Sequence, residues 1–153
     1  MGHAQYLARV DLNALTDRLE IDDLGTRYAT AVDAKDWALY RTCFTDDATI
    51  DYTAAGGIRG NVDEITAWLD QALAGFANTL HYVTNRAVTL AGDTASGRLA
   101  YYNPMAVAGS PDRFLVAAGY YNDRYVRTAG GWRIAERVEE LTWLTTQGPS
   151  PSS

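Results

Sequence analysis

Histidine and cysteine are scarce in this chain of 153 residues, which contains two histidines and one cysteine. With Cys43 alone no internal disulfide can form, and a chain without disulfides fits a reducing compartment. His3 is the third residue of the chain and lies outside the predicted domain, so His81 is the histidine that we expect to take part in chemistry. One cysteine and one such histidine cannot assemble a zinc site, so we expect no bound metal.

Several sequence motifs are missing as well. The chain has no Gly-rich phosphate loop, no dinucleotide-binding fingerprint and no nucleophile-elbow serine, and we therefore expect no cofactor. No window approaches about 18 consecutive apolar residues, and no basic region leads into an apolar core near the N-terminus. These absences predict a cytoplasmic protein without a membrane-spanning segment or a signal peptide.

Basic residues are in the minority. Thirteen Lys and Arg stand against nineteen Asp and Glu, which gives a net charge of −6. Nucleic acids and anionic membranes bind basic faces, so neither is expected as a partner. Tyrosine is abundant by contrast, with ten Tyr beside four Trp and three Phe. Because a buried Tyr hydroxyl needs a hydrogen-bond partner, this excess indicates either a polar-tipped pocket or a subunit interface.

Hydrophobic periodicity predicts helices in the first half of the chain. Apolar residues spaced by three and four predict a helix over 13–34 with Thr16 as its N-cap, and a second, short helix over 37–44. A capping box that starts at Asn61 predicts a third helix, whose apolar stripe includes Phe76. Alternating residues predict strands over 48–53, 79–90, 94–105, 113–127 and 131–145.

This order of elements predicts an α+β domain. A sheet of such long strands must curl, and the helices can cover its concave side and leave a pocket between them. The length suits one domain, which we place at 11–146. A flexible N-terminus is expected at 1–10 and a disordered tail at 147–153.

His81, in the stretch LHYVTN, is the residue whose chemistry the sequence favours most. An imidazole with an ordinary pKa of about 6.5 suits acid–base catalysis if a carboxylate orients it. Alternatively, His81 is a strand histidine hydrogen-bonded to a backbone carbonyl, and periodicity does not decide between the two. Cys43 follows Tyr40 closely and precedes Phe44, so we interpret it as a core residue and not as a nucleophile.

Three separated segments resemble the SnoaL-like branch of the nuclear-transport-factor-2-like superfamily. They are RYATAVDAKDWALYRTCFTDDATIDY, LHYVTN and YYNDRYVRTAGGWRIAER, at 27–52, 80–85 and 120–137. The resemblance covers nearly everything from Leu19 to Trp143. It implies an α+β cone, in which a strongly curved mixed or antiparallel sheet wraps around N-terminal helices.

Within this superfamily the pattern is most similar to lyases that use an Asp–His dyad: scytalone dehydratase, bile-acid 7α-dehydratase and hexachlorocyclohexane dehydrochlorinase. In the last two the His follows the Asp by 48 residues, and Asp33 and His81 are also 48 residues apart. The resemblance therefore implies that Asp33 orients His81 and that His81 is the catalytic base. The catalytic Asp of ketosteroid isomerase corresponds to the position of Tyr52 in this chain. Isomerase chemistry by that route is therefore not expected.

The resemblance also implies Tyr28 and Arg137 as further catalytic residues and Tyr52 as a substrate-binding residue. From the residues alone, Tyr28 could be a core residue of its helix. The alternation of inward and outward side chains along a strand does not by itself place Arg137 inside the fold, and a bulge could change this alternation. Tyr102 and Tyr121, by their strand positions, and Phe76 are expected to contact the substrate.

The resulting hypothesis is a cofactor-independent lyase, a dehydratase that removes water from a small hydrophobic oxygenated molecule by Asp–His general base catalysis. Two alternatives stay open. One is a polyketide-cyclase-like or isomerase-like enzyme, which begins with the same carbon deprotonation. The other is a noncatalytic small-molecule-binding module. The relatives also imply a homo-oligomer, either a dimer or a trimer.

Overall fold

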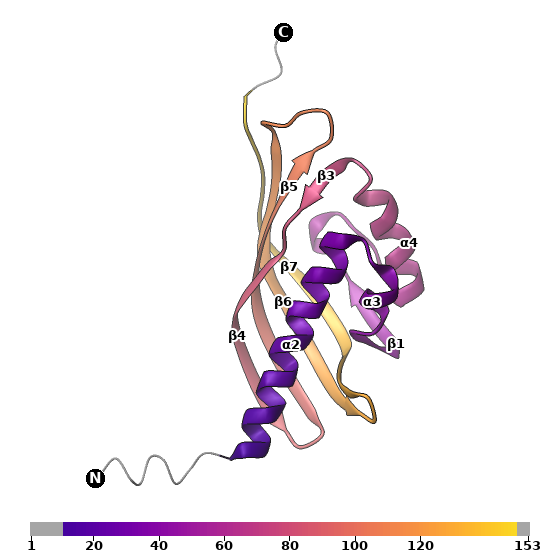
Figure 1. Ribbon diagram of the computed structural model, residues 1–153, viewed down its shortest axis with the longest axis vertical. Coiled ribbons are helices and arrows are strands. Elements are labelled where there is room, and N and C mark those ends of the chain that lie inside the picture. The colour runs from indigo at the N-terminus through magenta and orange to yellow at the C-terminus, as the bar shows by residue number, and fades with distance from the viewer. Residues whose placement is uncertain (1–10, 150–153) are drawn as a thin grey trace, which may run out of the picture.

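A curled sheet partly encloses a long helix in the computed structural model, which describes residues 11–149 (Figure 1). The expected flexible segment 1–10 lies outside these described residues, and so do residues 150–153 of the expected tail. The elements are α2 (Leu12–Ala34), α3 (Trp37–Arg41), β1 (Phe44–Asp51), η1 (Thr53–Ala55), β2 (Arg59–Gly60), α4 (Val62–Ala72), β3 (Phe76–Thr79), β4 (Tyr82–Ala91), β5 (Thr94–Val107), β6 (Phe114–Thr128) and β7 (Gly131–Gln147).

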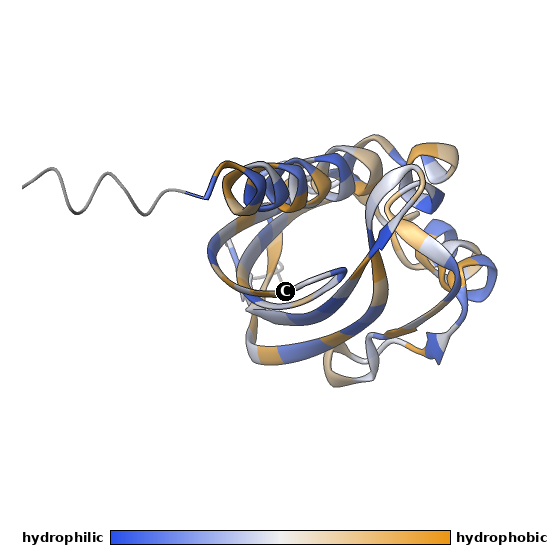
Figure 2. Cartoon of the chain, turned by 90° about the horizontal axis from the view of Figure 1, so that it is seen from below, coloured by the Kyte–Doolittle hydropathy of each residue, from blue (hydrophilic) through white to orange (hydrophobic). Residues whose placement is uncertain are grey.

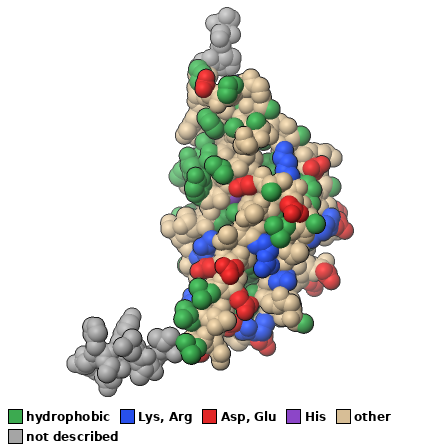
Figure 3. Space-filling model, in the orientation of Figure 1, with side chains coloured by type: hydrophobic (Ala, Val, Ile, Leu, Met, Phe, Trp, Pro, Cys, Tyr) green, Lys and Arg blue, Asp and Glu red, His purple; other side chains and the backbone are tan. Residues whose placement is uncertain are grey.

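The sheet has seven strands in the order β2-β1-β7-β6-β5-β3, and β4 also pairs with β5. The pair β1–β7 is parallel and the other pairs are antiparallel, so the sheet is mixed. Figure 2 shows the curvature of the sheet, with α2 across its concave side. The predicted α+β cone with helices on the concave side of the sheet is therefore confirmed. On the face shown in Figure 3, acidic and basic side chains are interspersed.

The helices differ from the prediction at their ends. Asp11, not Thr16, is the N-cap of α2, and its carboxylate accepts the Asn13 N–H. The Thr16 hydroxyl instead donates to the Leu12 carbonyl one turn earlier, inside the helix. The second helix ends at Arg41 and is shorter than predicted. In the described part of the chain, no helix is long and apolar enough to cross a membrane.

The third helix begins as predicted and ends early. The Asn61 side chain accepts the Glu64 N–H at 3.0 Å, and the Glu64 carboxylate accepts the Asn61 N–H at 2.9 Å, which confirms the capping box. The helix ends at Ala72, and a turn then leads into the strand β3, which was not predicted. Phe76 is the first residue of that strand and is not part of the helix.

Two extra residues in β7 change which of its side chains face the helices. Trp132 and Ile134 point inward, but the pairing with β6 shifts between Ile134 and Glu136, so Ala135 has no partner. Beyond this bulge, Arg137 and Glu139 point inward in place of the even-numbered residues. A second shift leaves Thr142 unpaired, and Leu144 then faces the interior.

Gly119 on β6 is required by the close approach of β7 at the second bulge. A Cβ at this position would collide with the carbonyl oxygen of Glu140. We expect Gly119→Ala to lower the free energy of unfolding by about 1–3 kcal/mol, the ordinary cost of overpacking a core. The control is Gly75→Ala, because a Cβ at Gly75 meets no atom within 4 Å. Urea unfolding of both variants measures the difference, and equal midpoints would contradict the prediction.

Candidate active site

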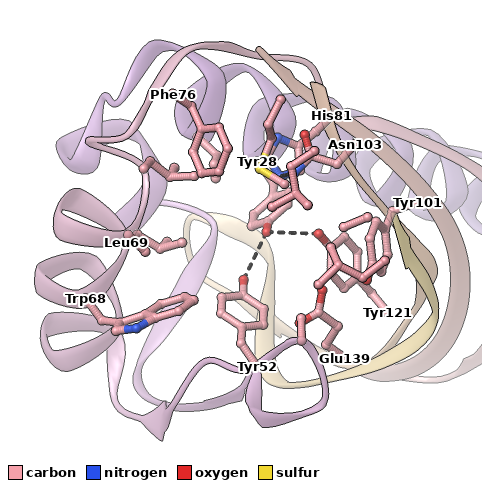
Figure 4. A pocket seen from close by; sticks show the side chains of 18 residues that line it. Tyr28, Tyr52, Trp68, Leu69, Phe76, His81, Tyr101, Asn103, Tyr121 and Glu139 are labelled. Atoms are coloured by element: carbon pink, nitrogen blue, oxygen red, sulfur yellow. Dashed lines mark hydrogen bonds between the residues drawn. The ribbon is translucent and has the colours of Figure 1, made fainter. Parts of the chain in front are cut away.

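A cavity of about 190 Å³ lies between α2, α4 and the concave face of the sheet (Figure 4). One wall is apolar and comes mainly from α4 and β3, with Trp68, Leu69, Leu73 and Phe76. The facing wall carries the polar groups, which belong to Tyr28, Tyr52, His81, Tyr101, Asn103, Tyr121 and Glu139. An apolar cavity with a few convergent polar groups is the usual form of a small-molecule site.

Asp33 and His81 meet at the edge of this cavity. Asp33 lies in the last turn of α2, and its Oδ1 is 2.6 Å from Nδ1 of the His81 ring. Its Oδ2 accepts the His81 backbone N–H at 2.9 Å, and Oδ1 also accepts the Thr79 hydroxyl at 2.9 Å. The carboxylate therefore holds both the backbone and the ring of His81. The His81 side chain is 6% exposed and that of Asp33 is 21% exposed.

His81 is not in a continuous strand, as we had predicted, but in the two-residue break between β3 and β4. Both strands pair with β5, and Leu80 and His81 lie opposite the segment around Pro104. The Leu80 N–H donates to the Pro104 carbonyl, but Pro104 has no N–H to continue the ladder. The break leaves the His81 N–H free to bind Asp33.

The contacts of His81 define its tautomer. An ionised carboxylate only accepts hydrogen bonds, so Nδ1 carries the proton that is donated to Asp33. Nε2 lies 3.0 Å from the Asn103 side-chain nitrogen, and when the imidazole is neutral Nε2 accepts the Asn103 N–H. The Asn103 Oδ1 is buried and has no hydrogen-bond partner among the described residues. In this tautomer the lone pair that a general base requires lies on Nε2, and it becomes available to a substrate proton when the substrate displaces the Asn103 N–H.

The charge of Asp33 is maintained by its hydrogen bonds. Burial alone would raise the pKa of this carboxyl, and a carboxylate at a helix C-terminus is also unfavourable. Hydrogen bonds from the His81 ring, the His81 backbone and the Thr79 hydroxyl outweigh burial and hold the pKa of Asp33 below its ordinary value. Asp33 is therefore suited to remain ionised beside His81.

Three tyrosine hydroxyls meet at the floor of the cavity. The Tyr28 hydroxyl is 3.0 Å from that of Tyr52 and 3.4 Å from that of Tyr121 (Figure 4). Tyr40, behind them, is 3.2 Å from Tyr52. Burial raises the pKa of all of these phenols, so they stay protonated and can donate. The network offers neutral donors to an oxygen that gains negative charge.

Arg137 does not line the cavity, contrary to expectation. Its guanidinium is fully buried and forms a two-point ion pair with Asp123, at 2.8 and 2.6 Å, and not with Asp33. The guanidinium carbon lies 4.1 Å from the ring centroids of both Tyr28 and Tyr121. Burial lowers the pKa of Arg137, but the Asp123 carboxylate reverses this and keeps it charged. Arg137 therefore packs against the rings of Tyr28 and Tyr121 from outside the cavity.

Tyr102 was expected to contact the substrate but does not line the cavity. It is 40% exposed and lies on the outer face of the sheet, beside Tyr82 in the paired strand. Its neighbours Tyr101 and Asn103 point into the cavity instead. Alternation along the strand indicates that either Tyr102 or its neighbours Tyr101 and Asn103 face inward. The pairing register of the strand decides between them, and the sequence does not show this register.

Glu139 is a cavity residue that the sequence reasoning missed. It lies beyond the Ala135 bulge and pairs in register with Tyr121 of β6. Burial raises the pKa of its carboxyl, although the Tyr101 hydroxyl and the Arg137 charge oppose this. Among residues 11–149, no three His, Cys, Asp or Glu side chains are grouped as metal ligands.

The comparisons with known proteins agree on the family. The sequence model of the SnoaL-like domain matches residues 13–138, and the chain therefore belongs to the SnoaL-like domain family. The resemblance inferred from the three sequence segments is confirmed. A relative from Mycobacterium tuberculosis, an uncharacterized protein, is 43% identical over 125 residues, which cover 82% of this chain and 85% of the relative.

Solved structures of lower identity share the fold. Hexachlorocyclohexane dehydrochlorinase of type 2 superposes with a TM-score of 0.80 and is 20% identical, covering 94% of this chain and 97% of that chain. A protein of Novosphingobium aromaticivorans, proposed to be a scytalone dehydratase, has a TM-score of 0.77 and 18% identity, covering 92% of each chain. At these identities the likeness establishes the fold, which lyases also adopt.

Proposed function

We propose that the protein is a cofactor-independent lyase that removes water from a small, hydrophobic β-hydroxy carbonyl compound. The observation that carries the proposal is the Asp33–His81 contact at the edge of a cavity floored by tyrosine hydroxyls. The cavity of about 190 Å³ is below the range of about 300–1,000 Å³ that is usual for pockets of drug-sized ligands, which favours a small substrate.

The strength of the base limits the substrate. An imidazole has an ordinary pKa of about 6.5 and is a weak base, so it removes a proton from carbon most readily where a neighbouring carbonyl acidifies that carbon. Negative charge then gathers on the carbonyl oxygen as an enolate forms. The hydroxyls of Tyr28, Tyr52 and Tyr121 are protonated donors beside the cavity, and such preorganised donors stabilise an enolate oxygen.

Asp33 has a separate role in this proposal. It keeps the His81 proton on Nδ1, so that Nε2 can accept the substrate proton when the substrate displaces the Asn103 N–H. When His81 becomes an imidazolium, the ionised Asp33 stabilises the new positive charge. The hydrogen bonds that hold the pKa of Asp33 low therefore favour proton transfer to His81.

The test is Asp33→Asn, with 3-hydroxycyclohexanone as the probe substrate and formation of cyclohex-2-enone followed by its ultraviolet absorbance. We expect kcat/KM to fall by about 10²-fold, less than the about 10⁴-fold loss for the equivalent change in the serine-protease triad. The loss is smaller because the Asp33 side chain is 21% exposed, so that water can partly replace its charge.

Asp47→Asn is the matched control, because Asp47 is an exposed residue of β1. Wild-type turnover by Asp33→Asn, with unchanged folding, would show that Asp33 is only structural. Exchange of the carbon-bound proton with deuterium oxide, without loss of water, would support a proton-transfer enzyme in place of a dehydratase.

A further inference from the structure

We infer that Glu139 is the general acid of this site and donates its proton to the hydroxyl group that leaves the substrate. The inference rests on the proposed lyase function and assigns the half of the reaction that the Asp33–His81 pair does not perform. A hydroxide ion is a poor leaving group, so dehydration at neutral pH requires a proton donor near the departing oxygen.

The position of Glu139 suits this role. Glu139 and His81 line the same cavity, and Figure 4 shows them on different sides of it, with the tyrosines between. The Tyr101 hydroxyl is buried close enough to Glu139 to lower the pKa of this carboxyl, but the geometry gives the hydroxyl no hydrogen-bond partner within 3.5 Å among the described residues. A buried donor that lacks a partner near a carboxyl group, on the polar wall of the cavity, indicates a place where a substrate oxygen binds.

The surroundings of Glu139 favour its protonated form. The charged and titratable groups that interact electrostatically with this carboxyl come from five elements and are Tyr28 of α2, Asp51 of β1, Tyr101 of β5, Tyr121 of β6 and Arg137 of β7. Burial raises the pKa of Glu139, the Tyr101 hydroxyl and the Arg137 charge oppose the rise, and Asp51 adds to it. The Arg137 charge is already paired with Asp123, which limits its effect.

Two carboxyl groups of this cavity are thus shifted in opposite directions. The pKa of Asp33 is lowered by its hydrogen bonds, and the pKa of Glu139 is raised by burial. Such a divergence is how one site holds a charged group and a proton donor at the same pH. The next residue, Glu140, faces outward and pairs with Arg98, and its pKa is lowered by that hydrogen bond.

The proposed step balances. His81 Nε2 takes the proton from the carbon next to the carbonyl, and the electrons of that C–H bond form an enolate. As the carbonyl re-forms, this electron pair makes the new C=C bond to the carbon that bears the hydroxyl. The C–O bond breaks with its electron pair on oxygen, and this oxygen takes the Glu139 proton and leaves as water. His81 has gained one proton and Glu139 has lost one. Exchange with solvent water restores both groups.

The experiment compares Glu139→Gln with wild type on two probes that yield the same product. 3-Hydroxycyclohexanone must lose water, whereas 3-acetoxycyclohexanone loses acetate, which departs without a proton. We expect Glu139→Gln to lower kcat/KM about 10²-fold for the hydroxy probe and to leave the acetoxy probe nearly unaffected. Glu140→Gln is the control, since Glu140 is adjacent in sequence, faces outward and should change neither reaction.

The pH dependence of kcat/KM provides a second test. Because the raised pKa belongs to a group that must be protonated, wild-type activity on the hydroxy probe should fall as pH rises through the pKa of Glu139. This falling limb should be absent from Glu139→Gln. Infrared spectroscopy provides a test without turnover: in wild type and in Glu140→Gln one protonated carboxyl band should persist to higher pH than that of an exposed glutamate, and Glu139→Gln should lack this band.

The outcomes separate this inference from the proposed function. Equal losses on both probes, or no loss on either while Asp33→Asn stays impaired, would overturn the role of Glu139 and leave the lyase standing. If wild type accelerates neither probe, the proposed function fails for this class of substrate. The infrared band still decides, because a Glu139 carboxyl that ionises at the same pH as an exposed glutamate overturns the inference.

Discussion

His81→Ala is expected to lower kcat/KM for elimination from 3-hydroxycyclohexanone by about 10²–10⁴-fold, the usual contribution of a positioned general base. The described residues contain no second histidine that could replace it. The tyrosines of the cavity cannot substitute as bases, since burial raises the pKa of Tyr28, Tyr52 and Tyr121 and keeps them protonated.

The fold should survive this change. The backbone N–H of residue 81 can still donate to Asp33, and the break between β3 and β4 depends on Pro104 and not on the imidazole. Urea midpoints close to wild type would establish this. Added imidazole should restore part of the activity of His81→Ala, because the deleted ring leaves a space of its own shape. Wild-type turnover by His81→Ala would eliminate His81 as the base.

Arg137→Met is expected to lower the free energy of unfolding by about 3–5 kcal/mol, the cost of breaking a buried ion pair from one side. Both partners of the pair are completely buried, and removal of the guanidinium leaves the Asp123 carboxylate without a countercharge. The faces of Tyr28 and Tyr121 also lose the cation that lies 4.1 Å from each ring centroid. Urea unfolding with fitted m-values measures the effect.

The control is the double variant Arg137→Met with Asp123→Asn. It removes the unpaired charge and keeps an acceptor for the Tyr125 hydroxyl, which donates to Asp123 at 2.9 Å. We expect the double variant to be more stable than Arg137→Met alone, because no net charge remains buried. A single variant as stable as wild type would mean that Arg137 contributes packing only.

Local sequence signals predicted the helices and most strands, because these elements have a strong period or a recognisable cap. The capping box at Asn61 is an example, and the strands β5, β6 and β7 lie within a few residues of their predicted bounds. The break at Leu80 was missed, because it depends on Pro104, which lies on another strand. Which residues face each other across a sheet is decided by register, and one strand does not carry that information.

The candidate site was predictable only in part for the same reason. Asp33 and His81 were paired through the family spacing, and the structure brings them within 2.6 Å. Tyr102 was chosen over Tyr101 because alternation does not identify the inner face. Glu139 was missed because the bulge at Ala135 reverses the alternation that Trp132 and Ile134 establish.

The unpaired Ala135 has a consequence for which groups the cavity can hold. If Ala135 entered the ladder opposite Arg124, every later residue of β7 would move by one position, so Val138 and Glu140 would turn inward and Arg137 and Glu139 would turn to the solvent. Loss of the Ala135 codon would instead remove the bulge and leave Arg137 opposite Asp123 and Glu139 opposite Tyr121, as they are now. A slip in pairing, with no substitution at any of the four positions, is therefore enough to exchange one set of reactive groups for another.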